Sequence, residues 1–194
     1  MVASRFAGPA PGAAELHDAA LDYLGRYAAT EAGLRRMLER RVDRWARRAT
    51  ATADTEGVTR AAAAARSIAR EVVARLVAAG AVNDAAYAES RARSLIRSGR
   101  SRRATAAQLG AKGVDPAIAR AALPDDDASE LAAALVLARK RRIGPFRTGA
   151  PPDDAGRRRE LGMLARAGFP QSVARRALAM DLGQAEALVN LLRR

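Results

Sequence analysis

Helix stop signals recur at short intervals in the middle of this chain and limit what it can fold into. Gly80, Gly99 and Gly113 each follow a segment whose apolar residues return every three or four positions. This spacing is typical of an amphipathic helix, and a glycine just past a helix end accepts the left-handed backbone that closes it. We therefore interpret residues 72–123 as a run of short helices forming one complete structural repeat, which Pro124 ends.

Helix start signals stand between these stops. Asn83 and Asp84 offer side-chain acceptors to the free N–H groups of a helix over about residues 84–98. The next helical pattern begins at Ser101 and runs to Lys112. Asp115 followed by Pro116 predicts a cap and a proline in the first helical position of one more short helix.

The composition favours a wholly helical protein. Apolar residues make up 49% of the chain but aromatic residues only 4%, so alanine, leucine, valine and isoleucine must supply the core. Alanine suits helices, and no segment alternates apolar and polar residues as a half-buried strand does. We expect an all-α fold.

Further helices are expected on both sides of the central stretch. Thr30 is expected to cap the helix that begins at residue 31. Gly144 and Pro145 are expected to end the helix that precedes the polar loop over residues 148–156. The expected helix ranges are residues 15–27, 31 to about 45–48, 58–79, 129–142, 157–167, 171–180 and 182–192, with loops over 49–57 and 148–156. They group into a flexible leader (1–14), a first three-helix repeat with an inserted loop near 48–57 (15–80), a second repeat (81–124), a third repeat (125–180) and a helical tail (181–194).

An internal repeat supports this grouping. Residues 109–123 align without a gap on residues 164–178, with six identities in fifteen positions that include the pair Gly113 and Gly168. Upstream, we align Gly99 with Gly144.

The charge is strongly basic, with 34 lysine and arginine residues against 21 acidic ones and a net charge of +13. Such a balance favours a polyanionic partner or an acidic protein surface, without saying which. Only Lys112 and Lys140 are lysines, so a GC-rich genome accounts for part of the arginine content. Codon bias does not explain why basic residues outnumber acidic ones.

Two stretches of the central repeat resemble a known family. The pattern at residues 80–89, GAVNDAAYAE, and the spacing of Arg97, Gly99, Lys112 and Gly113 resemble the RecX regulatory proteins of bacterial recombination. The resemblance covers about residues 15–180. It departs at Gly33, at an insertion over residues 47–57 and in the tail after Asp181.

The resemblance implies a fold and a function that composition does not show. It implies three tandem three-helix repeats forming an elongated, curved molecule. It also implies a non-enzymatic regulator that binds the RecA nucleoprotein filament and limits its assembly or activity, which modulates homologous recombination, DNA repair and the SOS response. The alternative from the residues alone is a basic helical protein that binds single- or double-stranded DNA without the recombinase.

Two basic clusters are the candidate contact residues for a partner or for DNA. Helix geometry turns several of these side chains away from Ala88, Ala92 and Leu95. An ordinary solvated helix face, or cations placed near a helix C-terminus, explains the same pattern without any binding role. The first cluster is Arg91, Arg93, Arg97, Arg100, Arg102 and Arg103, and the second is Arg139, Lys140, Arg141 and Arg142.

The residues for common enzyme and metal sites are missing. His17 is the only histidine and there is no cysteine, which excludes a histidine or cysteine zinc site and a zinc protease motif. Trp45 and Tyr87 are expected to pack rather than stack on bases, and Asp84 is expected to be a helix cap. We expect no enzyme activity and no cofactor. The longest strongly apolar run, residues 131–138, is too short to cross a membrane, so we expect no membrane partner. The lack of cysteine suits a reducing cytosol, so we expect a cytoplasmic protein. No sustained heptad pattern occurs, and we expect a monomer.

Overall fold

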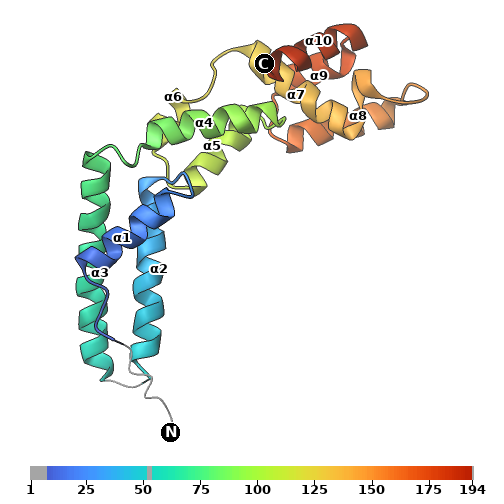
Figure 1. Cartoon of the computed structure of the whole chain (residues 1–194). Helices are drawn as coiled ribbons and strands as arrows, with labels where there is room; N and C mark the ends of the chain where they lie inside the picture. Colours follow the sequence, from blue (N-terminus) through green and yellow to red (C-terminus); the bar gives the residue numbers. More distant parts are fainter. Residues whose placement is uncertain (1–7, 52–53, 194) are drawn as a thin grey trace. The chain divides into compact units, whose positions relative to one another are not determined.

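The structure, a computed structural model, describes residues 8–51 and 54–193 and confirms the all-α prediction. Within these residues only helices, turns and connecting segments occur, and no strand is present. The elements in chain order are α1 (Ala13–Leu24), α2 (Glu31–Ala49), α3 (Thr55–Ala78), α4 (Asp84–Arg97), α5 (Arg102–Ala111), α6 (Pro116–Ala121), α7 (Asp127–Arg141), the 3-10 helix η1 (Gly144–Phe146), α8 (Asp154–Arg166), α9 (Gln171–Ala179) and α10 (Leu182–Arg193) (Figure 1).

Side-chain caps define most of the helix starts. Thr30 accepts the N–H of Gly33 at the start of α2, and Ser101 accepts that of Ala104 at the start of α5. Asp115 caps α6 as its sequence position predicts, with Pro116 in the first turn. Each cap satisfies an N–H group that has no partner within its own helix.

Three helices begin earlier than expected because an aspartate caps each of them. In α7 this aspartate is Asp126, which accepts the N–H of Ser129 and moves the start from residue 129 to Asp127. Asp54 accepts the N–H of Gly57 at 2.7 Å, so α3 begins at Thr55 and the predicted loop over residues 49–57 is shorter. Asp153 caps α8 in the same way, which moves its start from the expected residue 157 to Asp154. Residues 1–7 of the expected leader lie outside the described part of the chain.

Asp84 caps a different helix from the expected one. The side chain of Asn83 accepts the N–H of Ala86 at 2.9 Å and so caps α4. The Asp84 Oδ1 atom instead accepts the backbone N–H of Glu31 at 2.8 Å, in the first turn of α2. The prediction that Asp84 caps its own helix was therefore wrong.

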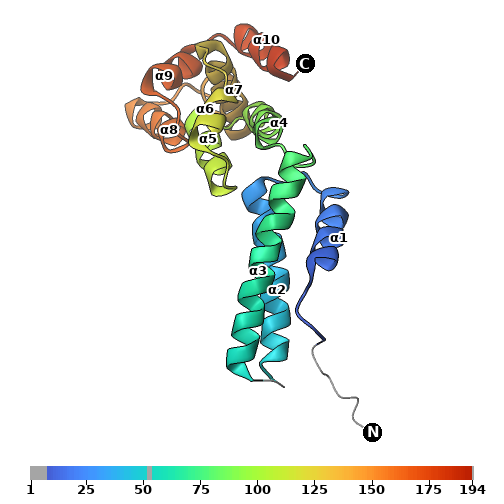
Figure 2. The same cartoon turned by 90° about the vertical axis from the view of Figure 1, so that its left-hand side faces the viewer.

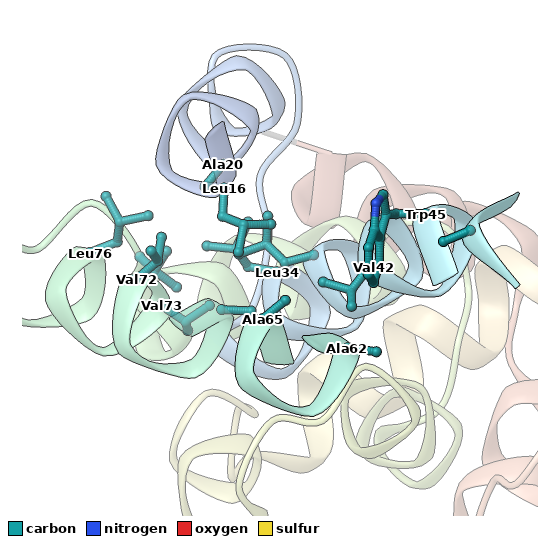
Figure 3. Close-up of a cluster of buried hydrophobic side chains, with 14 of the residues drawn as sticks. Leu16, Ala20, Leu34, Val42, Trp45, Ala62, Ala65, Val72, Val73 and Leu76 are labelled. Carbon is teal, nitrogen blue, oxygen red and sulfur yellow. The ribbon is translucent and has the colours of Figure 1, made fainter. Parts of the chain in front are cut away.

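The chain divides into two compact units, Met1–Tyr87 and Ala88–Arg194, and the division falls within α4. In the first unit, α2 and α3 lie side by side and α1 packs against them (Figures 1 and 2). Their core contains Leu16, Val42 and Val72, and Figure 3 shows Trp45 among these apolar side chains. The Trp45 indole N–H donates to the Gly8 carbonyl at 2.8 Å, and Trp45 is buried as expected.

The second unit has a core built around α7. Residues 131–136 of this helix are all buried, so neighbours cover nearly every side of it. Helices α9 and α10 pack against α7, and α8 packs against α9. Ala185 and Val189 of α10 belong to the same core as Leu135 and Leu164. The predicted C-terminal tail is therefore part of this core.

The aligned repeat segments have the same backbone turn. At the end of α5, the Val114 N–H donates to the Leu109 carbonyl at 3.2 Å. At the end of α8, the Phe169 N–H donates to the Leu164 carbonyl, also at 3.2 Å. The glycine before each donor has a positive φ, and both leucines are fully buried. Their alignment thus reflects a shared helix-ending structure.

The upstream alignment is shifted by two positions. The backbone N–H of Arg100, the residue after Gly99, donates to the Leu95 carbonyl. The backbone N–H of Ile143, the residue after Arg142, donates to the Ala138 carbonyl in the same way. Arg142 takes the left-handed conformation, with φ 54° and ψ 47°. The structural counterpart of Gly99 is therefore Arg142, and its alignment with Gly144 was wrong.

Gly99 cannot carry a side chain without a clash. Its φ is +84°, and an added Cβ would lie 3.0 Å from both the Leu137 nitrogen and the Val136 Cγ1 atom. Gly149 also has a positive φ, of +114°, but an added Cβ there would meet nothing within 4 Å. The two glycines thus share a backbone conformation that would strain any other residue, and they differ in the space around them.

We predict that Gly99→Ala destabilises the protein more than Gly149→Ala. The left-handed backbone should cost either variant about 1–2 kcal/mol. Overpacking against α7 should add about 1–3 kcal/mol for Gly99→Ala alone. Urea denaturation followed by circular dichroism measures both, and equal losses would contradict the close approach of the turn to α7.

Candidate partner-binding surface

The polar side of α4 carries three exposed arginines, Arg93, Arg97 and, just after the helix, Arg100. Ala88 and Ala92 are fully buried on the other side, as helix geometry predicts. Arg91 lies at the border and is half-buried. Arg93 is 3.8 Å from Glu89, whereas Arg97 and Arg100 have no carboxylate within ion-pair distance in the described part of the chain. This side of the helix therefore presents uncompensated positive charge.

Arg102 has a different environment from its neighbours. Its side chain is 28% exposed and points to three acidic residues of the segment that begins the third repeat. The guanidinium lies 3.4 Å from Asp125, 3.6 Å from Asp127 and 3.7 Å from Glu130. These three carboxylates compensate the positive charge of the Arg102 guanidinium. Arg102 therefore joins the second and third repeats and is poorly placed to bind a partner.

Glu130 is the buried member of this group, with a side-chain exposure of 2%. One of its oxygens accepts the backbone N–H of Arg102 at 2.9 Å, in the first turn of α5. Burial raises the pKa of Glu130, while the Arg102 N–H and guanidinium oppose this rise only in part. A carboxylate from α7 thus caps a helix of the preceding repeat.

Ser101 and Arg103 also lie at this junction. The Ser101 hydroxyl donates to the Ala167 carbonyl at 2.8 Å, at the end of α8. An added Cβ on Gly168 would lie 2.5 Å from that hydroxyl and 3.2 Å from the Arg103 Nε atom. The absent side chain of Gly168 therefore leaves room for both residues, and Arg103 remains exposed.

The second basic cluster continues around the end of α7. Lys140 Nζ donates to the Ser98 carbonyl at 2.7 Å, just beyond the end of α4. Arg141 and Arg142 are exposed, while Arg139 is half-buried. Lys140 thereby brings the cluster at the end of α7 next to the end of α4.

A cavity of about 490 Å³ lies where these segments meet. We call it the basic pocket; its lining residues are Ser98, Gly99, Arg100, Leu137, Lys140, Arg141, Met163, Arg166 and Ala167. It joins Arg100 of the first predicted cluster to Lys140 and Arg141 of the second. The other predicted residues do not line it. Arg166 was not among the contact residues predicted from the sequence, because nothing in its local pattern separates it from the other arginines of α8.

In the described residues, 8–51 and 54–193, no group of three or more histidine, cysteine, aspartate or glutamate side chains could hold a metal ion. No helix in the same residues combines the length and apolar character needed to cross a membrane.

Comparison with known proteins places the chain in a family. Residues 83–123 match the family model described as RecX, second three-helix domain. The Regulatory protein RecX of Myxococcus xanthus (strain DK1622) is 43% identical over 165 residues, which cover 84% of this chain and 83% of the relative. The chain belongs to the RecX family. The RecX of Agrobacterium fabrum (strain C58 / ATCC 33970) is 39% identical over 110 residues, covering 57% of this chain and 58% of that protein.

A solved RecX structure supports the fold. The crystal structure of RecX from Lactobacillus salivarius matches 90% of this chain and 97% of its own, with a TM-score of 0.59 and 18% sequence identity. The curated relatives are named regulatory proteins, so this RecX-family chain belongs to a family of regulators.

We predict that Arg102→Ala destabilises this RecX-family protein, whereas Arg97→Ala does not. Loss of Arg102 leaves Glu130 buried without its counter-charge and should cost about 2–4 kcal/mol in unfolding free energy. Loss of the exposed Arg97 should change it by less than about 0.5 kcal/mol. Chemical denaturation measures both values. A loss for Arg97→Ala as large as that for Arg102→Ala would contradict the different roles given to the two arginines.

We also predict a pH dependence that Glu130→Gln removes. Because the folded pKa of Glu130 is raised, its stabilising contribution is fully present below the ordinary value of 4.5 and is lost as pH rises through the folded pKa. The natural chain should therefore lose stability relative to Glu130→Gln above pH 4.5, until the carboxyl group is fully ionised. Denaturation of both proteins over a pH series tests this; a difference that is constant or grows in favour of the natural chain would contradict it.

Proposed function

We propose that this protein binds the RecA nucleoprotein filament and limits its assembly or activity. In that role it modulates homologous recombination and DNA repair, including the SOS response, as a cytoplasmic regulator without catalysis of its own. The observation that carries the proposal is an exposed arginine surface in a chain of the RecX family. We define this arginine face by Arg93, Arg97, Arg100 and Arg103.

The charge of the arginine face suits a filament of protein and DNA. Within the described residues, Arg97, Arg100 and Arg103 have no ion-pair partner, so their guanidinium groups are available to phosphates or carboxylates. Attraction between this face and a polyanionic filament raises the association rate and weakens as salt screens the charges. Binding should therefore fall as ionic strength rises.

The repeat organisation supports a binding role. The repeats are small sets of helices, and helices such as α4 bury one apolar side while exposing polar side chains on the other. Tandem helical repeats commonly provide binding surfaces that reach several sites on one partner. A chain of this kind can contact more than one subunit of a polymer.

The second candidate function is DNA binding without the recombinase. The net charge of +13 favours it, because phosphate contacts supply most of the affinity of non-specific DNA binding. The two functions differ in one respect that can be measured. A protein that only occupies DNA competes for sites, so more DNA removes its effect.

The test is the ATPase rate of the cognate recombinase on single-stranded DNA, with this protein added in substoichiometric amounts after filaments have formed. We predict a fall in rate that excess DNA does not restore. Arg97→Glu with Arg103→Glu should raise the concentration needed for inhibition by about tenfold or more, because charge reversal weakens attraction and leaves repulsion in its place.

A matched control separates this surface from total charge. Arg47→Glu with Arg70→Glu reverses the same number of exposed arginines in the first unit. This control should inhibit nearly as well as the natural chain. Equal loss in both double variants would remove the arginine face from the interface. Full rescue by excess DNA would instead favour the DNA-binding function.

A further inference from the structure

The basic pocket differs from the arginine face because it is concave and has two kinds of surface. Three separate segments line it: the turn after α4, the last turns of α7 and the end of α8. Its volume of about 490 Å³ lies in the range of sites that hold a few side chains or a small molecule. All of its lining residues belong to the second unit.

Four cationic side chains surround the pocket, and no acidic residue lines it. Arg100, Arg141 and Arg166 have no carboxylate within ion-pair distance in residues 8–51 and 54–193. Lys140 donates to the Ser98 carbonyl, which leaves further donors on its ammonium group. By contrast, three carboxylates surround Arg102 nearby. The pocket therefore favours a negatively charged ligand.

The remaining surface of the pocket is apolar. Leu137, Met163 and Ala167 are partly exposed there, while no aromatic side chain lines the cavity. Single-stranded nucleic acid gains much of its affinity by stacking bases on aromatic rings, which this pocket lacks. A phosphate group alone would leave the apolar surface uncovered. The flexible thioether of Met163 suits aliphatic side chains of various shapes.

Contacts within the chain hold the basic pocket in shape. Close packing holds the Gly99 turn against α7, since an added Cβ would meet the Leu137 nitrogen at 3.0 Å. The bond from Lys140 to Ser98 and the bond from Ser101 to Ala167 fix the same turn from α7 and from the end of α8. A site already held in shape loses little conformational entropy when it binds.

We infer that the basic pocket binds a peptide segment of a protein partner in which an apolar side chain is flanked by carboxylates. The apolar side chain covers Leu137 and Met163, and the carboxylates pair with Arg100, Arg141 and Arg166. The inference deepens the proposed function, on which it rests for the partner: such a segment belongs to the protein component of the filament. The chemistry of the pocket can nevertheless be tested without that filament.

The test uses nuclear magnetic resonance of the full ¹⁵N-labelled chain with three short synthetic peptides. The first alternates glutamate and leucine, the second replaces leucine with serine, and the third replaces glutamate with glutamine. The first should shift the amide resonances of Gly99, Arg141 and Ala167 in a saturable way. Each of the other two should bind at least about tenfold more weakly, because the serine peptide lacks the apolar side chain and the glutamine peptide lacks the carboxylates.

Matched variants locate the binding. Arg141→Glu with Arg166→Glu should weaken binding of the first peptide by about tenfold or more. Arg158→Glu with Arg159→Glu reverses two exposed arginines of α8 that do not line the pocket, and should change it by less than about threefold. Met163→Gln keeps every charge and should remove most of the preference for leucine over serine.

Two results would overturn the inference. One is that none of the peptides shifts the pocket resonances. The other is that the leucine and serine peptides bind equally while a single-stranded oligonucleotide shifts the same resonances, which would assign the pocket to nucleic acid. Because the recombinase is absent, these results do not depend on the ATPase assay. Peptide binding without filament inhibition would support the peptide chemistry of the pocket, and would remove both the proposed function and the assignment of the segment to the filament.

Discussion

A buried carboxylate joins the two repeats of the second unit, and the surfaces around it depend on that contact. Glu130 of α7 accepts the N–H of Arg102 in the first turn of α5, and the Arg102 guanidinium lies beside it. Burying the charge is costly and raises the pKa of Glu130, and the helix N-terminus with the guanidinium offsets part of this cost. Removing Arg102 leaves Glu130 buried without its counter-charge, whereas Arg102 also has Asp125 and Asp127 beside it. The contact therefore favours one arrangement of α5 against α7.

That arrangement explains why the basic side chains fall into two classes. Arg102 is held by the acidic residues of the junction and acts within the chain. Arg97 and Arg103, on the same stretch of sequence, are exposed and available to a partner. Around the Gly99 turn, the same packing brings Arg100 next to Lys140 and so forms the basic pocket. Internal stability and external binding are thus assigned to different arginines of one cluster.

Features with local causes could be predicted from the sequence. Thr30 and Ser101 cap their helices through partners three residues away, so position alone indicates these bonds. Asp84 bonds to Glu31, 53 residues away, and Arg102 bonds to Glu130, 28 residues away. Such bonds depend on which helices meet, and helix periodicity does not contain that information. The two basic clusters could be recognised in the sequence. That Arg100, Lys140 and Arg141 line one pocket together with Arg166 could be seen only in the structure.

Native-state hydrogen exchange of the second unit tests most directly whether the junction makes its two repeats one cooperative structure. Amide exchange would be followed at increasing denaturant for Leu109 of α5 and Ala177 of α9, which are both fully buried and lie beyond the first turn of their helices. We predict the same opening free energy and the same denaturant dependence for the two amides. Exchange of Ala177 through a separate opening of lower free energy, with Leu109 still protected, would contradict a single cooperative structure.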